Sequence, residues 1–244
     1  MRIIVLAMMA AMAATGVWGN NALKASRSLN ASSASKGSKG FKAANALNVP
    51  KAPGRVPETL DGVRPIAEAA RAANHIALVN VDHAIPDDIW PLVATYAASR
   101  VQLNIWTNSL EKSIVGALVV DPRATLRRAL GDKACVGVFV ERNANGASFM
   151  QSPGAWSMVN VRGLDRDSPD RRTLADRYAK MILKGLAFAA GGGASLDSAC
   201  SLYYNSFTLE GMDRTGVQIS PMSYFPMIEI LRAVGGNEIV TPVE

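Results

Sequence analysis

Apolar residues recur along this chain with two different periods, and this predicts a protein built of both strands and helices. The run HIALVNV at His75–Val81 has strand length and is rich in β-branched residues, which favours a buried strand. Residues 86–99 begin with Pro and two acids and then place apolar residues at helical spacing, which predicts a helix. Residues 101–106 alternate and predict a second strand. Strand, helix and strand together predict a right-handed parallel unit.

The middle of the chain continues this pattern. Residues 114–120 and 134–140 are short apolar runs that predict a third and a fourth strand, with a basic helix over 122–130 between them. Alternation over 148–161, interrupted by Pro153 and Gly154, predicts an edge strand and one further strand; a covering hairpin is the alternative.

A long amphipathic helix is predicted over residues 170–190. Asp167, Ser168, Pro169 and Asp170 supply a capping side chain and a proline at its start, and the triple glycine 191–193 ends it. A C-terminal helix is predicted over 224–234, with Pro226 in its first turn. The expected fold class is α/β: a mixed, mostly parallel sheet of four or five strands packed on two main helices.

Charge and composition divide the chain into three parts. Residues 1–19 have the charged start, short apolar core and small-residue cleavage site of a signal peptide. Residues 20–57 form a basic, low-complexity leader that is expected to be disordered, and 58–244 form the domain. We therefore expect an exported protein, periplasmic or secreted, with no integral membrane segment after signal cleavage.

The net charge of +6 does not indicate a nucleic-acid-binding protein. Residues 1–57 carry eight Lys and Arg and no acid, so the remaining residues hold 18 basic and 20 acidic groups. A nucleic-acid-binding domain concentrates its basic residues on a folded face or among stacking aromatics. No nucleic-acid partner is expected.

The stretch KGLAFAAGGGA at residues 184–194 has the spacing of a metal-binding motif without its ligands. The metzincin signature H-E-x-x-H-x-x-G-x-x-H places two histidines one helical turn apart, a glutamate as general base, a helix-ending glycine and a third histidine. This chain carries at those positions, in order, Lys184, Gly185, Phe188, Gly191 and Ala194. Only the glycine is retained, and a single match is no better than chance.

The residues that follow extend the register. Ala194 is followed by Ser195, four residues, and then Cys200, Ser201, Leu202 and Tyr203, with Asn205, Ser206 and Asp213 beyond. This order resembles the archaemetzincins. In that family a Cys follows the third His, and after four more residues come Cys-x-Met, a Tyr and a polar run that leads to an Asp. Leu202 stands at the Met that floors the site and conserves its volume and polarity. Ser195 replaces one of the cysteines that help to hold a second, structural zinc in the family.

The resemblance implies a zincin-like domain with a degenerate active site, in which an edge strand at 149–156 borders the substrate groove. Without its ligands the site is expected to bind no metal and no cofactor, so the protein is interpreted as a catalytically inactive pseudoprotease. We hypothesise that the groove binds an unknown protein or peptide through Lys184 with Tyr203 or Tyr204. Two alternatives remain: the stretch is an ordinary apolar helix with a glycine-rich end, and the tyrosines only pack around a turn.

The remaining catalytic chemistry is sparse. The chain has two histidines, His75 and His83, both far from the long helix, and it has no G-x-S-x-G motif. The alternative function is an enzyme of unrecognised chemistry that uses Lys184 with Asp197 or Asp213.

Two cysteines, Cys135 and Cys200, allow one disulfide in an exported protein. The bond requires Cα atoms within about 7 Å of each other; two separate buried thiols are the alternative.

Overall fold

The computed structural model describes residues 55–59, 61, 65–144 and 146–235, without the side chain of Asn205. The predicted signal peptide and the leader up to residue 54 lie outside these residues. Val56, which the sequence assigns to the leader, is fully buried, and its N–H donates to the Asp176 carboxylate at 2.6 Å. Packed structure therefore begins at least two residues before the predicted domain boundary.

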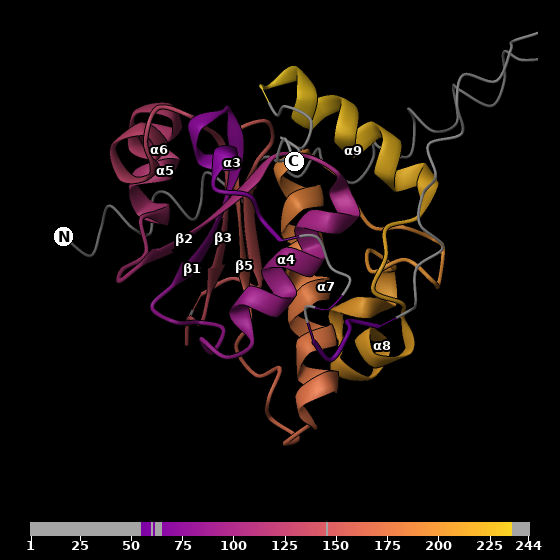
Figure 1. Ribbon diagram of the computed structural model, residues 1–244. Helices are drawn as coiled ribbons and strands as arrows, with labels where there is room; N and C mark the ends of the chain where they lie inside the picture. Colours follow the sequence, from indigo (N-terminus) through magenta and orange to yellow (C-terminus); the bar gives the residue numbers. More distant parts are fainter. Residues whose placement is uncertain (1–54, 60, 62–64, 145, 236–244) are drawn as a thin grey trace, which may run out of the picture. The chain divides into compact units, whose positions relative to one another are not determined.

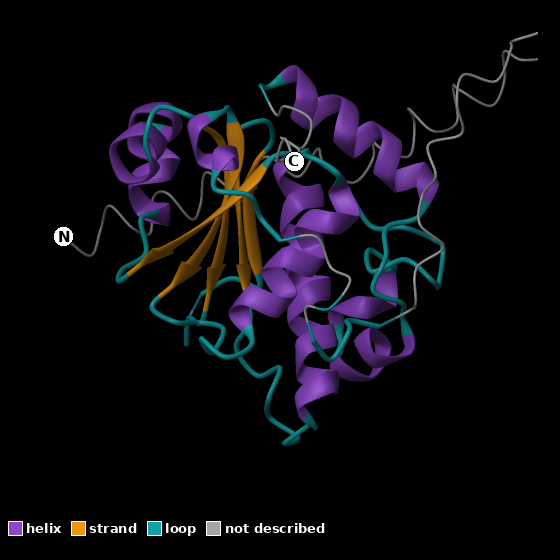
Figure 2. Cartoon of the chain, viewed as in Figure 1, coloured by secondary structure: helices purple, strands orange, loops and turns teal. Residues whose placement is uncertain are grey.

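A five-stranded sheet lies at the centre of the domain, with the strand order β2-β1-β3-β5-β4 (Figure 2). Its strands are β1 (His75–Val81), β2 (Ile105–Leu110), β3 (Ala134–Glu141), β4 (Phe149–Ser152) and β5 (Trp156–Asn160). The pairs β1–β2, β1–β3 and β3–β5 are parallel, whereas β4 pairs antiparallel with β5 at one edge. The predicted mixed, mostly parallel sheet is confirmed.

Helices cover both faces of the sheet (Figure 1). The helices α4 (Trp90–Val101) and α7 (Arg171–Ala189) pack on one face and on each other, and the short helices α5 (Val115–Val120) and α6 (Pro122–Leu130) cover the other. β1 is buried throughout. Ile76 and Leu78 belong to the hydrophobic core that includes α4 and α7, and Ala77 and Val79 belong to the core on the other face, which includes α5 and α6. Burial on both faces explains why residues 76–79 are one continuous apolar run.

Two predicted strands are corrected by the structure. Residues 114–120 form helix α5 instead of a strand; as a helix, this segment lays Val115 and Leu118 on the sheet and leaves Val120 exposed. A short apolar run does not distinguish the two states by periodicity. The second strand begins at Ile105, because α4 continues to Val101 and ends at Gln102 in the left-handed conformation, with φ of 54°.

The long helix α7 is confirmed, but Pro169 lies before its cap and not in its first turn as predicted. The Asp170 carboxylate accepts a hydrogen bond from the Thr173 N–H at 2.8 Å, so Asp170 is the cap and Pro169 precedes it. At the other end Gly191 has a φ of +75°, and the Gly192 N–H returns to the Ala187 carbonyl at 2.7 Å. This left-handed turn is the reason that the helix stops at the triple glycine.

The chain beyond Cys200 contains helical structure before the predicted C-terminal helix. It forms a 3-10 turn, η1 (Tyr204–Phe207), and helix α8 (Leu209–Arg214) beside α7, followed by helix α9 (Pro221–Ala233). Pro221 occupies the first turn of α9, so Pro226 lies inside the helix and not at its start. A short helix, α3 (Ala69–Ala72), precedes β1. Within the described residues, no helix combines the length and apolar character needed to cross a bilayer.

Candidate functional site

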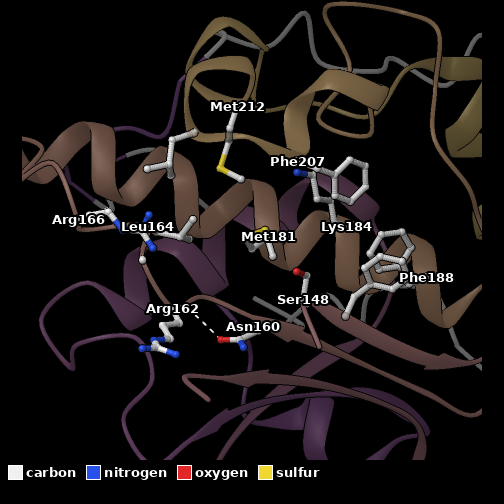
Figure 3. A pocket seen from close by; sticks show the side chains of 13 residues that line it. Ser148, Asn160, Arg162, Leu164, Arg166, Met181, Lys184, Phe188, Phe207 and Met212 are labelled. Atoms are coloured by element: carbon white, nitrogen blue, oxygen red, sulfur yellow. Dashed lines mark hydrogen bonds between the residues drawn. The ribbon is translucent and has the colours of Figure 1, made fainter. Parts of the chain in front are cut away.

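A cavity of about 180 Å³ lies at the positions where the sequence predicts the degenerate motif. It is bounded by α7, by the edge strand β4, by the loop that follows β5 and by the η1–α8 segment (Figure 3). We call it the α7 groove. Its lining includes Met181, Lys184 and Phe188 of α7, Phe149 of β4, Asn160, Arg162, Leu164 and Arg166 of the loop, and Phe207, Leu209 and Met212 of the η1–α8 segment.

Lys184, at the first ligand position of the motif, is fully buried. Its ammonium group donates to the Ser206 carbonyl at 2.5 Å and lies 4.4 Å from the centre of the Phe207 ring. Loss of hydration, and to a smaller extent the charge of Lys180, lower the pKa of Lys184 to about 7. This position therefore holds a buried cation with one carbonyl partner and a cation–π contact.

Phe188, at the second ligand position, belongs to a cluster of three phenylalanines. Its ring is 4% exposed and stacks on Phe149 of the edge strand with 4.6 Å between ring centroids. Phe207 lies 6.3 Å from Phe188 and 6.2 Å from Phe149. Phe149 and Phe207 remain 42% and 44% exposed, so the cluster presents apolar surface at the groove.

Gly185, at the position of the general base, packs directly on the sheet. A Cβ atom at this position would lie 2.7 Å from the Val138 Cγ1 atom, and Val159 is the next neighbour at 3.5 Å. The Ser157 hydroxyl also donates to the Gly185 carbonyl at 2.6 Å. Position 185 therefore cannot carry a glutamate unless Val138 moves.

The remaining motif positions lie beyond the end of α7. Ala194, at the third ligand position, is exposed, and the chain then returns beneath the helix end, where Ser195 forms a parallel bridge with Tyr203. Leu202 is buried in the same core as Phe188 and is not among the residues that line the α7 groove. A tight turn precedes Tyr203, whose N–H donates to the Cys200 carbonyl at 2.9 Å.

The residues at the motif positions do not fit a zinc ion. Zinc in proteins is held by sulfur, imidazole or carboxylate ligands, whereas these positions offer an ammonium, a phenyl ring and a methyl group. In the part of the chain that the structure describes, no three His, Cys, Asp or Glu residues are grouped so that they could hold a metal ion. His75 is buried at the start of β1 and His83 pairs with Asp87, both outside the α7 groove.

Two further buried cations on α7 were not found by sequence reasoning. The Lys180 ammonium donates to the Met212 carbonyl at 2.7 Å, and the Arg177 guanidinium bonds to both Asp167 and Asp213. Loss of hydration lowers the pKa of Lys180, and the hydrogen bonds from Arg177 lower the pKa of Asp167 to about 2. The signal was available, because Arg177, Lys180 and Lys184 recur at helical spacing on one side of an otherwise apolar helix.

The hypothesised patch of Lys184 with Tyr203 or Tyr204 is not formed. Lys184 is buried and bonded to Ser206, whereas Tyr204 is 51% exposed and packs on Tyr203 with 4.5 Å between ring centroids. Neither tyrosine is among the residues that line the α7 groove.

Neither proposed carboxylate partner of Lys184 meets it in the described structure. Asp213 binds Arg177, and the Asp197 carboxylate accepts from the Ala199 N–H at 2.9 Å within its own turn.

The two cysteines are free thiols. The buried Cys200 sulfur accepts from the N–H groups of Leu202 and Ser220 at 3.4 and 3.3 Å. Cys135, at the start of β3, lies near the Gly235 carbonyl, and burial raises its pKa. The structure therefore has the two separate thiols and not the disulfide.

No protein-family model matches this chain, and no curated protein does so either. Among solved structures, the chain is similar to an archaemetzincin from Methanopyrus kandleri, with a TM-score of 0.48 and 19% identity over 68% of this chain and 99% of that one. It is also similar to a zinc-dependent peptidase from Methanocorpusculum labreanum, with a TM-score of 0.48 and 12% identity over 62% of this chain and 99% of that one.

Proposed function

We propose that this protein is a non-catalytic, archaemetzincin-like binding protein that works outside the cytoplasm and holds a protein or peptide ligand in the α7 groove. The proposal that the protein is archaemetzincin-like and non-catalytic is supported by the motif spacing from Lys184 to Tyr203 together with the side chains found there. The proposal that it binds a protein or peptide is supported by the groove itself, which is open and partly apolar.

One observation carries the absence of catalysis. Zinc in proteins is held by sulfur, imidazole or carboxylate ligands, but the first ligand position presents the buried Lys184 amino group, which is already bonded to the Ser206 carbonyl, and the second presents the Phe188 ring. The place of the general base is closed as well, since Val138 occupies the space that a side chain at residue 185 would need. Without ligands and base, hydrolysis by a metal-bound water has no means to proceed.

The groove offers two features that suit an extended ligand. β4 pairs only with β5 in the described sheet, so its other edge is available for a further strand. The Phe149 and Phe207 rings, each somewhat less than half exposed, supply apolar surface next to that edge.

A second candidate function follows from the lowered pKa of Lys184. An amine with a pKa of about 7 in an apolar wall beside a second lysine has the properties of a nucleophile. Its complete burial and the engagement of Asp213 with Arg177 count against this alternative. Borohydride trapping of a simple aldehyde on residue 184, absent in Lys184→Met, would favour it.

Metal analysis and a protease assay on the purified full chain test the proposed function. We expect substoichiometric zinc after incubation with the ion and no cleavage of unfolded casein. Stoichiometric zinc, or cleavage that a chelator stops, would overturn the proposal. The matched control is the triple variant Lys184→His, Phe188→His and Ala194→His, which restores three ligands and keeps Gly185; zinc uptake by this variant alone shows that the assay detects a site in this frame.

A further inference from the structure

We propose that the α7 groove recognises the C-terminal carboxylate of a peptide whose last side chain is aromatic or aliphatic. This inference rests on the proposed function, because it names the ligand class of the same groove. It follows from the charge, the apolar surface and the size of the cavity.

All ionisable residues that line the groove are basic. Arg162 and Arg166 come from the loop after β5, Lys184 comes from α7, and no Asp or Glu is among the lining residues. Asp165 lies between the two arginines in sequence, but its carboxylate binds Arg142 at 2.9 Å. The groove is therefore complementary to an anion, and guanidinium groups are well suited to a carboxylate.

The two arginines and the phenylalanine rings lie on different sides of the groove. Figure 3 shows Arg162 and Arg166 on one side of Met181 and the Phe188 and Phe207 side chains on the other. The Lys184 ammonium lies against the Phe207 ring, below the surface. A ligand with a carboxylate at one end and an apolar group at the other matches this division.

The cavity volume limits what enters. Pockets that enclose drug-sized ligands measure roughly 300 to 1,000 Å³, and this cavity measures about 180 Å³. It therefore suits a single terminal residue better than a whole peptide, and the rest of the chain would run along the surface. The half-exposed rings of Phe149 and Phe207 would be covered by the terminal side chain.

The test compares two peptides that differ only at the terminus. Acetyl-Ala-Ala-Phe with a free carboxylate and the same peptide as its amide are titrated into the full chain by calorimetry at low salt. We expect the acid to bind at least about tenfold more tightly than the amide, because a carboxylate adds charge-assisted hydrogen bonds. The double variant Arg162→Gln and Arg166→Gln should bind both peptides equally.

Two controls keep the result interpretable. Arg128→Gln removes an exposed arginine of α6, on the other face of the sheet, and should leave the preference unchanged. The single variants Arg162→Lys and Arg166→Lys retain the charge, and they replace the double variant if thermal unfolding shows that it does not fold.

Equal binding of acid and amide would overturn the inference while leaving the groove as a binding site. Binding of neither peptide would also overturn it, without any consequence for the claim that the protein is not a protease. Chelator-sensitive cleavage of either peptide would instead overturn the proposed function.

Discussion

Two buried cations of α7, Arg177 and Lys184, differ in how the fold compensates their charge. Arg177 is 1% exposed, and its guanidinium is surrounded by acceptors: Asp167 at 2.6 and 2.8 Å, Asp213 at 2.9 and 2.6 Å and the Leu164 carbonyl at 2.5 Å. Lys184, about two turns further on, is also fully buried but has one carbonyl and one aromatic ring as described partners.

This difference separates a structural cation from one that the fold only tolerates. The hydrogen bonds that Arg177 donates to the Asp167 and Asp213 carboxylates raise the pKa of Arg177, so its charge is stabilised in the folded state. The pKa of Lys184 falls to about 7 because its contacts do not offset the loss of hydration. Of these two cations, Lys184 is therefore the one whose charge the fold compensates least.

The largest effect on stability is expected at Phe188, one helical turn beyond Lys184 on α7. Phe188→Ala removes a buried ring that stacks on Phe149, and large-to-small changes of this kind cost about 3 to 4 kcal/mol. Chemical denaturation of the purified variant measures the loss, and Phe188→Leu, which keeps most of the volume, should cost about 1 kcal/mol. A loss below that of the leucine control would mean that the ring does not pack as described.

Arg177→Met should destabilise the protein by about 2 to 3 kcal/mol. The change leaves Asp167 and Asp213 without their shared cation, and the cost stays below that of a fully buried pair because the Asp167 and Asp213 side chains are 54% and 36% exposed. Arg177→Lys keeps the charge but loses the fork of donors, so an intermediate value is expected in urea unfolding. An unchanged midpoint in Arg177→Met would contradict the structural role.

Lys184→Met should have the opposite sign and stabilise the protein by about 1 to 2 kcal/mol at neutral pH. The folded pKa is about 7 and the ordinary value is 10.5, so between these values the unfolded chain retains a proton that the folded chain has lost. The stability of the unsubstituted protein therefore rises with pH across this window, and the variant should lose this slope.

Unfolding free energies at a series of pH values from 6.5 to 10 check the Lys184 prediction. The control is Lys112→Met, at an exposed lysine, for which the slope should match that of the unsubstituted protein. If Lys184→Met is less stable than the unsubstituted protein at every pH, the Ser206 and Phe207 contacts outweigh the cost of burial, and the comparison with Arg177 no longer holds.

The sequence predicted those elements whose signals are local. β1, β3, α6 and α7 carry either long apolar patterns or specific start and stop residues such as Asp170 and Gly191, and the structure has them where they were expected. The 114–120 segment was assigned to the wrong state because a short apolar run packs on a sheet equally well as a strand or as a helix.

The sequence predicted which residues of α7 lie at the site, but not how deeply Lys184 is buried. Motif spacing places Lys184 and Phe188 on one helix, and both line the α7 groove. The depth of Lys184 depends on η1 and α8, which pack on α7 through the carbonyls of Ser206 and Met212. Helical spacing places Lys180 and Lys184 on one side of α7, but the sequence carries no signal for the carbonyls that they meet, so the tyrosine patch was predicted where the structure has a buried amine.

The smallest effect is expected at Tyr204, and it tests which contact holds η1. Tyr204 begins this turn and is half exposed, and its ring meets Tyr203. An aromatic pair at this exposure contributes about 0.5 kcal/mol, so Tyr204→Ala should shift the unfolding midpoint only slightly. Hydrogen exchange at the Ser206 N–H, which donates to the Tyr203 carbonyl at 2.8 Å, reports on η1 directly. If exchange there rises strongly in Tyr204→Ala but not in Lys184→Met, the tyrosine pair and not the buried amine holds the turn in place.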